Sequence, residues 1–425
     1  MTKKIFPNDF FWGASTASHQ VEGKTINQWT VWELANASSL SKQAKQRLDY
    51  LDNWQDIEKH ATSPSNYVSG KGVDHYNRYK EDFGIAKQLN LNAFRFGIEW
   101  SRIEPSEGEW DDKEIAHYQE YIAELKRNDL EPFLNIWHWT MPVWFTDKGG
   151  FEKSKNLKYW KRYVQKIIDI FGDEFRYIIT INEPNVYSTF SYILGEWPPN
   201  TKNPITGALV YINLIRAHKI AYKIIKKKNT AIQVGVASQL ANIQAKRPRN
   251  IVDVSSTQFM RYWWNWWFLN RIRKQQDFVG FNYYLSDYYK NFTIDNPKAP
   301  VSDLGWYMEP EGLYQLLTRV WSHYKKPIII TENGLADSKD TNREWWIEET
   351  IVAMERALSE GIQLKGYFHW SLLDNFEWKY GWWPEFGLVK VDRSNSMKRT
   401  VRPSAIWYKN KIELLKKGSA PTESS

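Results

Sequence analysis

The sequence predicts an α/β fold, a single (β/α)8 barrel whose active site lies at the C-terminal ends of the strands. Two observations favour this fold. Short apolar runs rich in β-forming residues alternate with longer helical patterns, and most runs end in polar, aromatic or charged residues. Eight strands separated by helices are what a closed parallel barrel requires. The C-terminal strand ends of a barrel meet on one face, so the residues after the runs are gathered there.

The expected strands are separated by segments with the spacing of amphipathic helices. In chain order they are residues 11–14, 93–98, 132–137, 177–181, 232–237, 278–283, 327–331 and 365–370. Between the third and the fourth, Trp160, Val164 and Ile167 share one face of an expected helix. No linker interrupts the alternation. We therefore expect residues 1–417 to form one barrel domain, followed by a disordered tail over residues 418–425.

Composition narrows the possible sites and partners. The chain has no cysteine, which excludes disulfides, thiolate metal sites and cysteine nucleophiles. It lacks both a long apolar run and an apolar N-terminal signal segment, so we expect a cytoplasmic protein with no membrane partner. The net charge of +8 is spread along the chain. Its densest run, Lys226–Lys228, closes a helical pattern over residues 209–225, where lysines complement the carbonyl end, and nucleic acid is not expected as a partner.

Aromatic residues are unusually abundant, with 24 tryptophans in 425 residues. Large, rigid, amphipathic rings suit faces that pack on sugars, and they suit a heavily aromatic core equally well. Composition leaves both interpretations open. The histidines are expected to be structural at His19 and His75, and His218 is expected to be a hydrogen-bonded core residue.

Two glutamates follow apolar strands and are flanked by asparagine. Glu183 stands in Thr-Ile-Asn-Glu-Pro after the fourth strand, and Glu332 stands in Ile-Thr-Glu-Asn-Gly at the end of the seventh. Glycoside cleavage needs two carboxyl groups beside the bond, and retention of configuration needs them about 5–5.5 Å apart. A barrel can bring these strand ends face to face across its mouth. The pair is therefore the expected catalytic centre.

Several long blocks in this order resemble glycoside hydrolase family 1, the β-glucosidase and β-galactosidase family, from Phe6 to about Lys411. The blocks are residues 10–23 (FFWGASTASHQVEG), 94–103 (FRFGIEWSRI), 180–184 (TINEP), 330–334 (ITENG) and 370–378 (WSLLDNFEW). The resemblance implies a retaining exo-β-glycosidase. Such an enzyme would hydrolyse terminal β-D-glucosyl residues, and also galactosyl or fucosyl residues, through a covalent glycosyl-enzyme.

The resemblance also implies roles for individual residues. Glu183 would be the acid/base and Glu332 the nucleophile, contacted by Arg95 and Tyr284, while Asn182 would hold the sugar 2-hydroxyl. The implied substrate-binding residues are Gln20, His138, Asn182, Trp306, Trp370, Glu377 and Trp378.

Within that set, the resemblance separates the parts of the sugar. Gln20, His138 and Trp378 would contact the 3- and 4-hydroxyls, and Glu377 would contact the 4- and 6-hydroxyls. Trp370 would lie beneath the ring. In the family, a carboxylate at the position of Glu377 distinguishes unphosphorylated from 6-phosphorylated sugars. Trp306 resembles a tryptophan of the leaving-group subsite.

The chain departs from the family in two segments. It is short between the fifth and sixth strands, around residues 244–278, where an aromatic run occupies residues 262–268. Core packing is the favoured interpretation of that run, with a face toward an opening as the alternative. The charged helical pattern within residues 35–72 is unusual too, and one interpretation is a roof over the entrance.

Two alternatives remain beside hydrolysis. A transglycosylase would use the same residues with a sugar acceptor in place of water, and a catalytically weak sugar-binding barrel would normally have lost one glutamate. We expect no metal and no cofactor, since zinc-binding and phosphate-loop motifs are absent from the sequence. The expected partners are small β-glycosides or oligosaccharides. The preferred sugar, the leaving group and the oligomeric state stay open.

Overall fold

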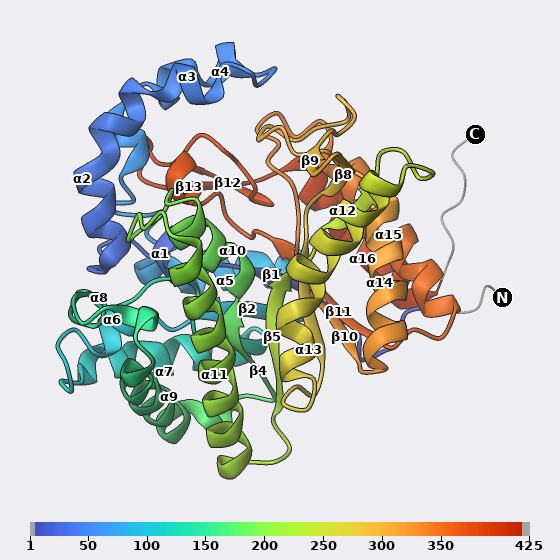
Figure 1. Ribbon diagram of the computed structural model, residues 1–425. Helices are drawn as coiled ribbons and strands as arrows, with labels where there is room; N and C mark the ends of the chain where they lie inside the picture. Colours follow the sequence, from blue (N-terminus) through green and yellow to red (C-terminus); the bar gives the residue numbers. More distant parts are fainter. Residues whose placement is uncertain (1–4, 419–425) are drawn as a thin grey trace.

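Eight parallel strands form a closed barrel in the computed structural model, which describes residues 5–418 (Figure 1). The order around the barrel is β1-β11-β10-β7-β5-β4-β3-β2. The strands are β1 (Phe11–Ser15), β2 (Ala93–Gly97), β3 (Glu131–Asn135), β4 (Tyr177–Asn182), β5 (Gln233–Gln239), β7 (Val279–Tyr283), β10 (Ile328–Asn333) and β11 (Leu364–Trp370). Each coincides with a predicted strand to within a few residues. The (β/α)8 barrel is confirmed.

Helices surround the barrel, as Figure 1 shows for α7, α9, α11 and α14. The main ones are α5 (His75–Gln88), α7 (Asp112–Arg127), α9 (Leu157–Phe171), α11 (Pro204–Lys228), α14 (Pro310–Tyr324), α15 (Arg343–Ser359) and α16 (Pro403–Lys417). The predicted apolar face of α9, including Trp160, Val164 and Ile167, is fully buried. Lys226–Lys228 close α11 as expected, and Lys226 Nζ lies 2.6 Å from Asp277 Oδ2. Ordinary amphipathic packing thus fixes the frame of the site.

The interior of the barrel is filled by side chains. One apolar cluster takes side chains from all around the barrel, namely Phe11, Ala93, Phe133, Ile179, Ala237, Phe278, Ile329 and Phe368. The rings of Phe11 and Phe133 meet edge to face at 5.0 Å between centroids. Such layers of bulky residues make the barrel a packed core rather than a pore.

Further elements lie above the barrel in Figure 1, beyond its regular strands and helices. They are α2 (Gln28–Lys42), α3 (Ala44–Leu48), α4 (Trp54–Ala61), the three-stranded sheet β6 (Asn242–Ala245), β8 (Ser286–Lys290) and β9 (Thr293–Ile294), and the hairpin β12 (Val389–Asp392) and β13 (Lys398–Val401). The connection from β5 to β7 also contains α12 (Ile251–Arg261), the π-helical turn η6 (Tyr262–Trp266) and α13 (Trp267–Ile272).

The unusual segment 35–72 forms the end of α2 and then α3 and α4. Ala44, Leu48 and Leu51 belong to an apolar cluster against which Trp306 packs. The segment therefore supports that side of the mouth from behind. The predicted tail falls, from residue 419 onward, outside the described residues. Within residues 5–418, no helix combines the length and the apolar character that a membrane crossing needs.

Candidate active site

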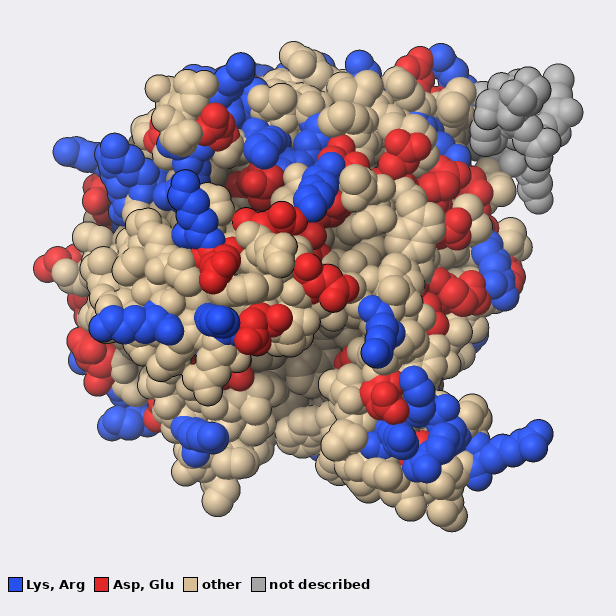
Figure 2. All heavy atoms as spheres, turned by 90° about the horizontal axis from the view of Figure 1, so that it is seen from above, with Lys and Arg blue, Asp and Glu red and all other residues tan. Residues whose placement is uncertain are grey.

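A cavity of about 320 Å³ opens at the C-terminal ends of the strands, and the same face is hollowed near its middle in Figure 2. The predicted site residues that line it are His138, Glu183, Tyr284, Trp306, Glu332, Trp370, Glu377 and Trp378. Gln20, Arg95 and Asn182 are fully buried and reach these residues through hydrogen bonds. No residue of segment 35–72, all of which the structure describes, lines this cavity. The barrel thus brings together every site residue expected from the sequence.

Glu332 is held on both of its oxygens. It stands near the end of β10, where Oε1 accepts a hydrogen bond from Arg95 Nη1 and Oε2 accepts one from Tyr284 Oη at 2.7 Å. Arg95, on β2, also donates through Nη2 to Asn182 Oδ1 at 2.6 Å. A buried guanidinium that forks between a carboxylate and an amide is a rigid positioning group, because its planar donors fix both partners at once.

Glu183 follows β4 directly and begins the short helix α10 (Pro184–Ser188). Its backbone is left-handed, with φ of 40°, and its amide donates to Ala237 O at 2.6 Å. Asn282 Nδ2 donates to Glu183 Oε1 at 2.8 Å. Burial, and after it the negative charge of Glu332, raise the pKa of Glu183 well above its usual range. Glu183 is therefore set up to carry a proton near neutral pH.

Asn282 is a site residue that the sequence reasoning missed. From β7 it donates to Asn182 Oδ1 at 3.2 Å as well as to Glu183, and its own Oδ1 accepts from Thr331 Oγ1 at 2.6 Å. It ties the end of β4 to β10. The signal available was an amide inside the apolar run 279–283, a position that a wholly apolar strand interior would not use.

The polar end of the cavity is centred on Glu377. Its Oε2 accepts from Asn375 Nδ2 at 3.1 Å and from Gln20 Nε2 at 3.4 Å. Burial raises the pKa of Glu377 to about 8. Gln20 Oε1 is buried and has no hydrogen-bond partner among the described residues, which leaves an acceptor free for a ligand hydroxyl.

Flat rings line the same end. Trp370 and Trp378 are nearly fully buried, and the ring of Trp378 lies 4.8 Å from that of Trp139. His138 lies beside Trp370, with ring centroids 5.8 Å apart, and its Nε2 is 3.0 Å from Asn182 Nδ2. Burial lowers the pKa of His138 well below its usual range, so the imidazole is neutral. Aromatic faces beside hydroxyl partners suit a pyranose ring.

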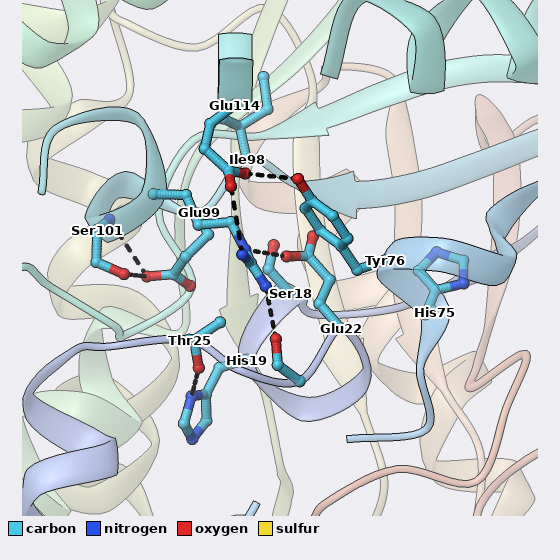
Figure 3. Close-up of polar contacts among 12 residues, drawn as sticks. Ser18, His19, Glu22, Thr25, His75, Tyr76, Ile98, Glu99, Ser101 and Glu114 are labelled. Atoms are coloured by element: carbon cyan, nitrogen blue, oxygen red, sulfur yellow. Dashed lines mark hydrogen bonds and ion pairs between the residues drawn. The ribbon is translucent and has the colours of Figure 1, made fainter. Parts of the chain in front are cut away.

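Figure 3 shows polar contacts that support this end without entering the cavity. His19 Nδ1 lies 3.0 Å from Thr25 Oγ1, and its Nε2 lies 2.6 Å from Glu33 Oε1. Ser101 Oγ donates to Glu99 Oε1 at 2.8 Å. His19 precedes Gln20, so these buried bonds fix the turn that carries Gln20 into the site. The structural role expected of His19 agrees with these contacts.

His75 and His218 are hydrogen-bonded in the same manner. His75 contacts Asp82 Oδ2 at 2.8 Å and Tyr121 Oη at 2.9 Å. His218 Nδ1 lies 2.7 Å from Thr180 Oγ1, and the residue is fully buried, as predicted for a core histidine. Within residues 5–418, no group of three or more His, Asp or Glu side chains is arranged to hold a metal ion.

The aromatic run 262–268 has a divided role. Trp266 and Phe268 are buried, and Trp267 stacks on Tyr211 with centroids 4.7 Å apart, so core packing is confirmed for these residues. Trp264 differs, because it lines the cavity. Tyr262 is 48% exposed. Trp266, Trp267 and Phe268 therefore pack in the core, whereas Trp264 lines the cavity.

Comparison with known proteins gives matches over nearly the whole chain. The sequence matches Glycosyl hydrolase family 1 over residues 2–274 and 269–417. Beta-glucosidase A of Thermotoga maritima is 31% identical, with 97% of this chain and 99% of that protein covered. Beta-glucosidase A of Acetivibrio thermocellus is 29% identical over 472 aligned positions, more than the 425 residues of this chain, so that relative carries segments missing here. Among solved structures, a beta-glycosidase from Pyrococcus horikoshii superposes with a TM-score of 0.85 at 30% identity, covering 100% of this chain and 97% of the other.

Proposed function

The chain belongs to glycosyl hydrolase family 1 and is a glycoside hydrolase, and we propose that it removes terminal β-D-glucosyl residues with retention of configuration. The observation that carries this proposal is the placement of Glu183 and Glu332 in one cavity, each with its own hydrogen-bond partners. Two carboxyl groups in distinct environments are the requirement for glycoside cleavage.

In the first step, a Glu332 oxygen attacks the anomeric carbon while Glu183 gives its proton to the glycosidic oxygen. The bond from the anomeric carbon to that oxygen breaks, the alcohol leaves, and the sugar is bound to Glu332 as an ester. Arg95 and Tyr284 keep the attacking carboxylate in position. Asn182, held by Arg95, is the partner proposed for the sugar 2-hydroxyl.

In the second step, Glu183 takes a proton from water as the water oxygen bonds to the anomeric carbon. The bond from that carbon to the Glu332 oxygen breaks, which regenerates the carboxylate and releases the sugar in the β configuration. Formation of the ester removes the negative charge of Glu332, which is one cause of the raised pKa of Glu183. The pKa of Glu183 therefore falls once the glycosyl-enzyme has formed. The same carboxyl group can serve as acid first and base second.

An unphosphorylated sugar fits the polar end of the cavity. Glu377 and Gln20 offer acceptors for the 3-, 4- and 6-hydroxyls. Lys379 lines the cavity but is already paired with Glu196, so its charge is not free for a phosphate. Glucose is the proposed sugar because the named relatives above include two β-glucosidases, with galactose as the epimer to be compared.

The test is hydrolysis of a panel of p-nitrophenyl glycosides by wild type and Glu332→Ala, with the released anomer followed by NMR. We expect β-glucoside turnover with β-glucose as the first product, and its loss in the variant. Release of α-glucose would overturn retention. A wild type that is inert on all unphosphorylated β-glycosides would overturn the proposal itself. Added alcohol acceptors would show how far transfer competes with hydrolysis, since both use the same residues.

A further inference from the structure

His138 contacts two amide side chains, one through each ring nitrogen. Its Nε2 lies 3.0 Å from Asn182 Nδ2, and its Nδ1 lies 3.2 Å from Asn135 Nδ2. Asn135 is the last residue of β3, is buried, and does not line the catalytic cavity. A neutral imidazole has one nitrogen that donates and one that accepts, and the neighbouring groups decide which is which. The two amides therefore select the tautomer of His138.

The orientation of the Asn182 amide is fixed by its other contacts. Asn182 Oδ1 accepts hydrogen bonds from Arg95 Nη2 at 2.6 Å and from Asn282 Nδ2 at 3.2 Å. A guanidinium only donates, so the amide oxygen faces Arg95 and the amide nitrogen faces His138. His138 Nε2 is then an acceptor and carries no proton. Burial, and after it the positive charge of Arg95, lower the pKa of His138, so the ring is neutral and its single proton is on Nδ1.

A proton on Nδ1 needs an acceptor, which Asn135 can supply. Asn135 Oδ1 is buried and has no hydrogen-bond partner within residues 5–418, while the donor Nδ2 faces His138. A half-turn of the amide exchanges its oxygen and nitrogen with little change of shape, and the surrounding hydrogen bonds decide between the two orientations. With Oδ1 toward His138, the Nδ1 proton is accepted. Asn135 also borders a cavity of about 10 Å³ with Glu99 and Thr140, where its nitrogen can donate to a water.

We propose that Asn135 is a positioning residue that holds His138 as the Nδ1-protonated tautomer, so that Nε2 presents a lone pair to the substrate. This inference rests on the proposed function, in which Asn182 is the partner of the sugar 2-hydroxyl. His138 lies beside Asn182, so the neighbouring 3-hydroxyl is the group that donates to Nε2. A hydroxyl has one proton, so the unpaired Gln20 Oε1 accepts from the 4-hydroxyl instead.

This tautomer couples recognition of two adjacent hydroxyls. In the free protein, the Nε2 lone pair of His138 is occupied by Asn182 Nδ2. The ring nitrogen has a single lone pair, so the 3-hydroxyl takes the place of Asn182 as its donor. Asn182 Nδ2 is then released to donate to the oxygen of the 2-hydroxyl. Correct placement of the 3-hydroxyl thus prepares the contact beside the anomeric carbon.

The first test observes the tautomer in the free, full-length protein labelled with ¹⁵N-histidine. Long-range proton–nitrogen correlation spectra show which ring nitrogen carries the proton, and the spectrum of His138→Gln assigns the signal. We expect His138 to be protonated at Nδ1 and unprotonated at Nε2 at neutral pH. A proton on Nε2, or on both nitrogens, would overturn the inference. This measurement does not depend on catalysis.

Replacement of Asn135 separates positioning from packing. Asn135→Leu fills a similar volume without an acceptor, whereas Asn135→Asp keeps an acceptor beside Nδ1. Wild type should cleave p-nitrophenyl 3-deoxy-β-D-glucoside about tenfold or more less efficiently than the parent glucoside, because Nε2 loses its donor. That ratio of kcat/KM values should fall severalfold in Asn135→Leu and be retained in Asn135→Asp. Asn156→Leu is the control, since Asn156 is a buried amide bonded to Gly150 O that does not line the cavity, and it should keep the wild-type ratio.

The outcomes separate this inference from the proposed function. An unchanged ratio in Asn135→Leu, or an equal fall in Asn135→Leu and Asn135→Asp, would overturn the role of Asn135. If Asn135→Leu does not fold, the wild-type spectrum and the ratio in Asn135→Asp decide. If wild type cleaves no glucoside, the proposed function falls, and the spectrum alone decides the tautomer.

Discussion

The two sides of the cavity are built on opposite principles. At the strand ends, Glu183, Glu332, Arg95 and Asn282 form a hydrogen-bonded network that crosses β2, β4, β7 and β10. The opposite side of the cavity, which we call the apolar wall, comes from elements outside the barrel and is lined by Ala241, Ile243, Met260, Trp264, Leu285 and Tyr289. Chemistry on a glycosidic bond needs atoms fixed relative to one another, which a closed barrel supplies. Recognition of a variable leaving group needs shape and apolar area, which an added segment can supply.

The largest effect is expected at the network. Glu332→Ala should lower kcat by about 10⁴-fold or more, because the covalent step has no attacking group. Azide with an activated dinitrophenyl glucoside should restore part of the rate and give the α-glucosyl azide, because the anion attacks from the face that Glu332 occupied. Product analysis by NMR checks the configuration. A β-azide from this variant would reverse the roles given to the two glutamates.

The next effect concerns Asn282 as a positioning residue. Asn282→Ala should lower kcat about 10- to 100-fold and raise the pKa of Glu183 further, because a hydrogen bond to its charged form is lost. The alkaline limb of the kcat/KM profile should then move to higher pH, as steady-state assays across the pH range would reveal. Asn213→Ala is the control. Asn213 lies on α11, does not line the cavity, and is a buried amide that donates a hydrogen bond to Phe151 O. It should leave the profile in place, and a matching shift there would remove the special role of Asn282.

A third effect is expected in stability. The pKa of Glu377 is about 8 in the folded protein, against an ordinary value of 4.5, so the folded state binds more protons than the unfolded state between these values. The wild type therefore loses stability as the pH rises from 4.5 to 8. Glu377→Gln should remove this loss and gain about 5 kcal/mol relative to wild type at pH 9 compared with pH 4. Urea unfolding at the two pH values measures it, and a difference independent of pH would contradict the raised pKa.

The smallest effect belongs to the apolar wall. Trp264→Ala should lower kcat/KM for phenyl β-glucoside about tenfold, since a ring that contacts the leaving group is lost. Tyr262→Ala, two residues away and 48% exposed, should change it less than twofold. Parallel initial-rate assays with methyl β-glucoside show whether the loss depends on the leaving group. If kcat/KM falls equally for the phenyl and methyl glucosides, Trp264 does not contact the leaving group, and its effect is on the hydrogen-bonded network of the two glutamates.

This contrast also explains what could be predicted from the sequence. Strand ends in a barrel point to one mouth, so Glu183 and Glu332 could be assigned to a single site from their positions, and the resemblance to the family added Glu377. The apolar wall could not, because β6 pairs with β8 across a separation of 44 residues, Asn242 with Ser286, outside the repeating pattern. Whether Trp264 faces the core or the cavity could not be predicted from the sequence. The π-helical turn η6 changes the angle between successive side chains, so a regular helical period misplaces them.

The left-handed backbone of Glu183 has a consequence for how this protein tolerates change. A side chain at φ of 40° is strained by about 1 kcal/mol, and glycine avoids that penalty. Glycine at position 183 would therefore relieve the backbone strain, while abolishing the acid. Random mutagenesis selected for thermal survival should drift toward Glu183→Gly, and selection for turnover should forbid it. At this position, stability of the fold favours glycine and catalysis requires glutamate, so the glutamate persists only under selection for function.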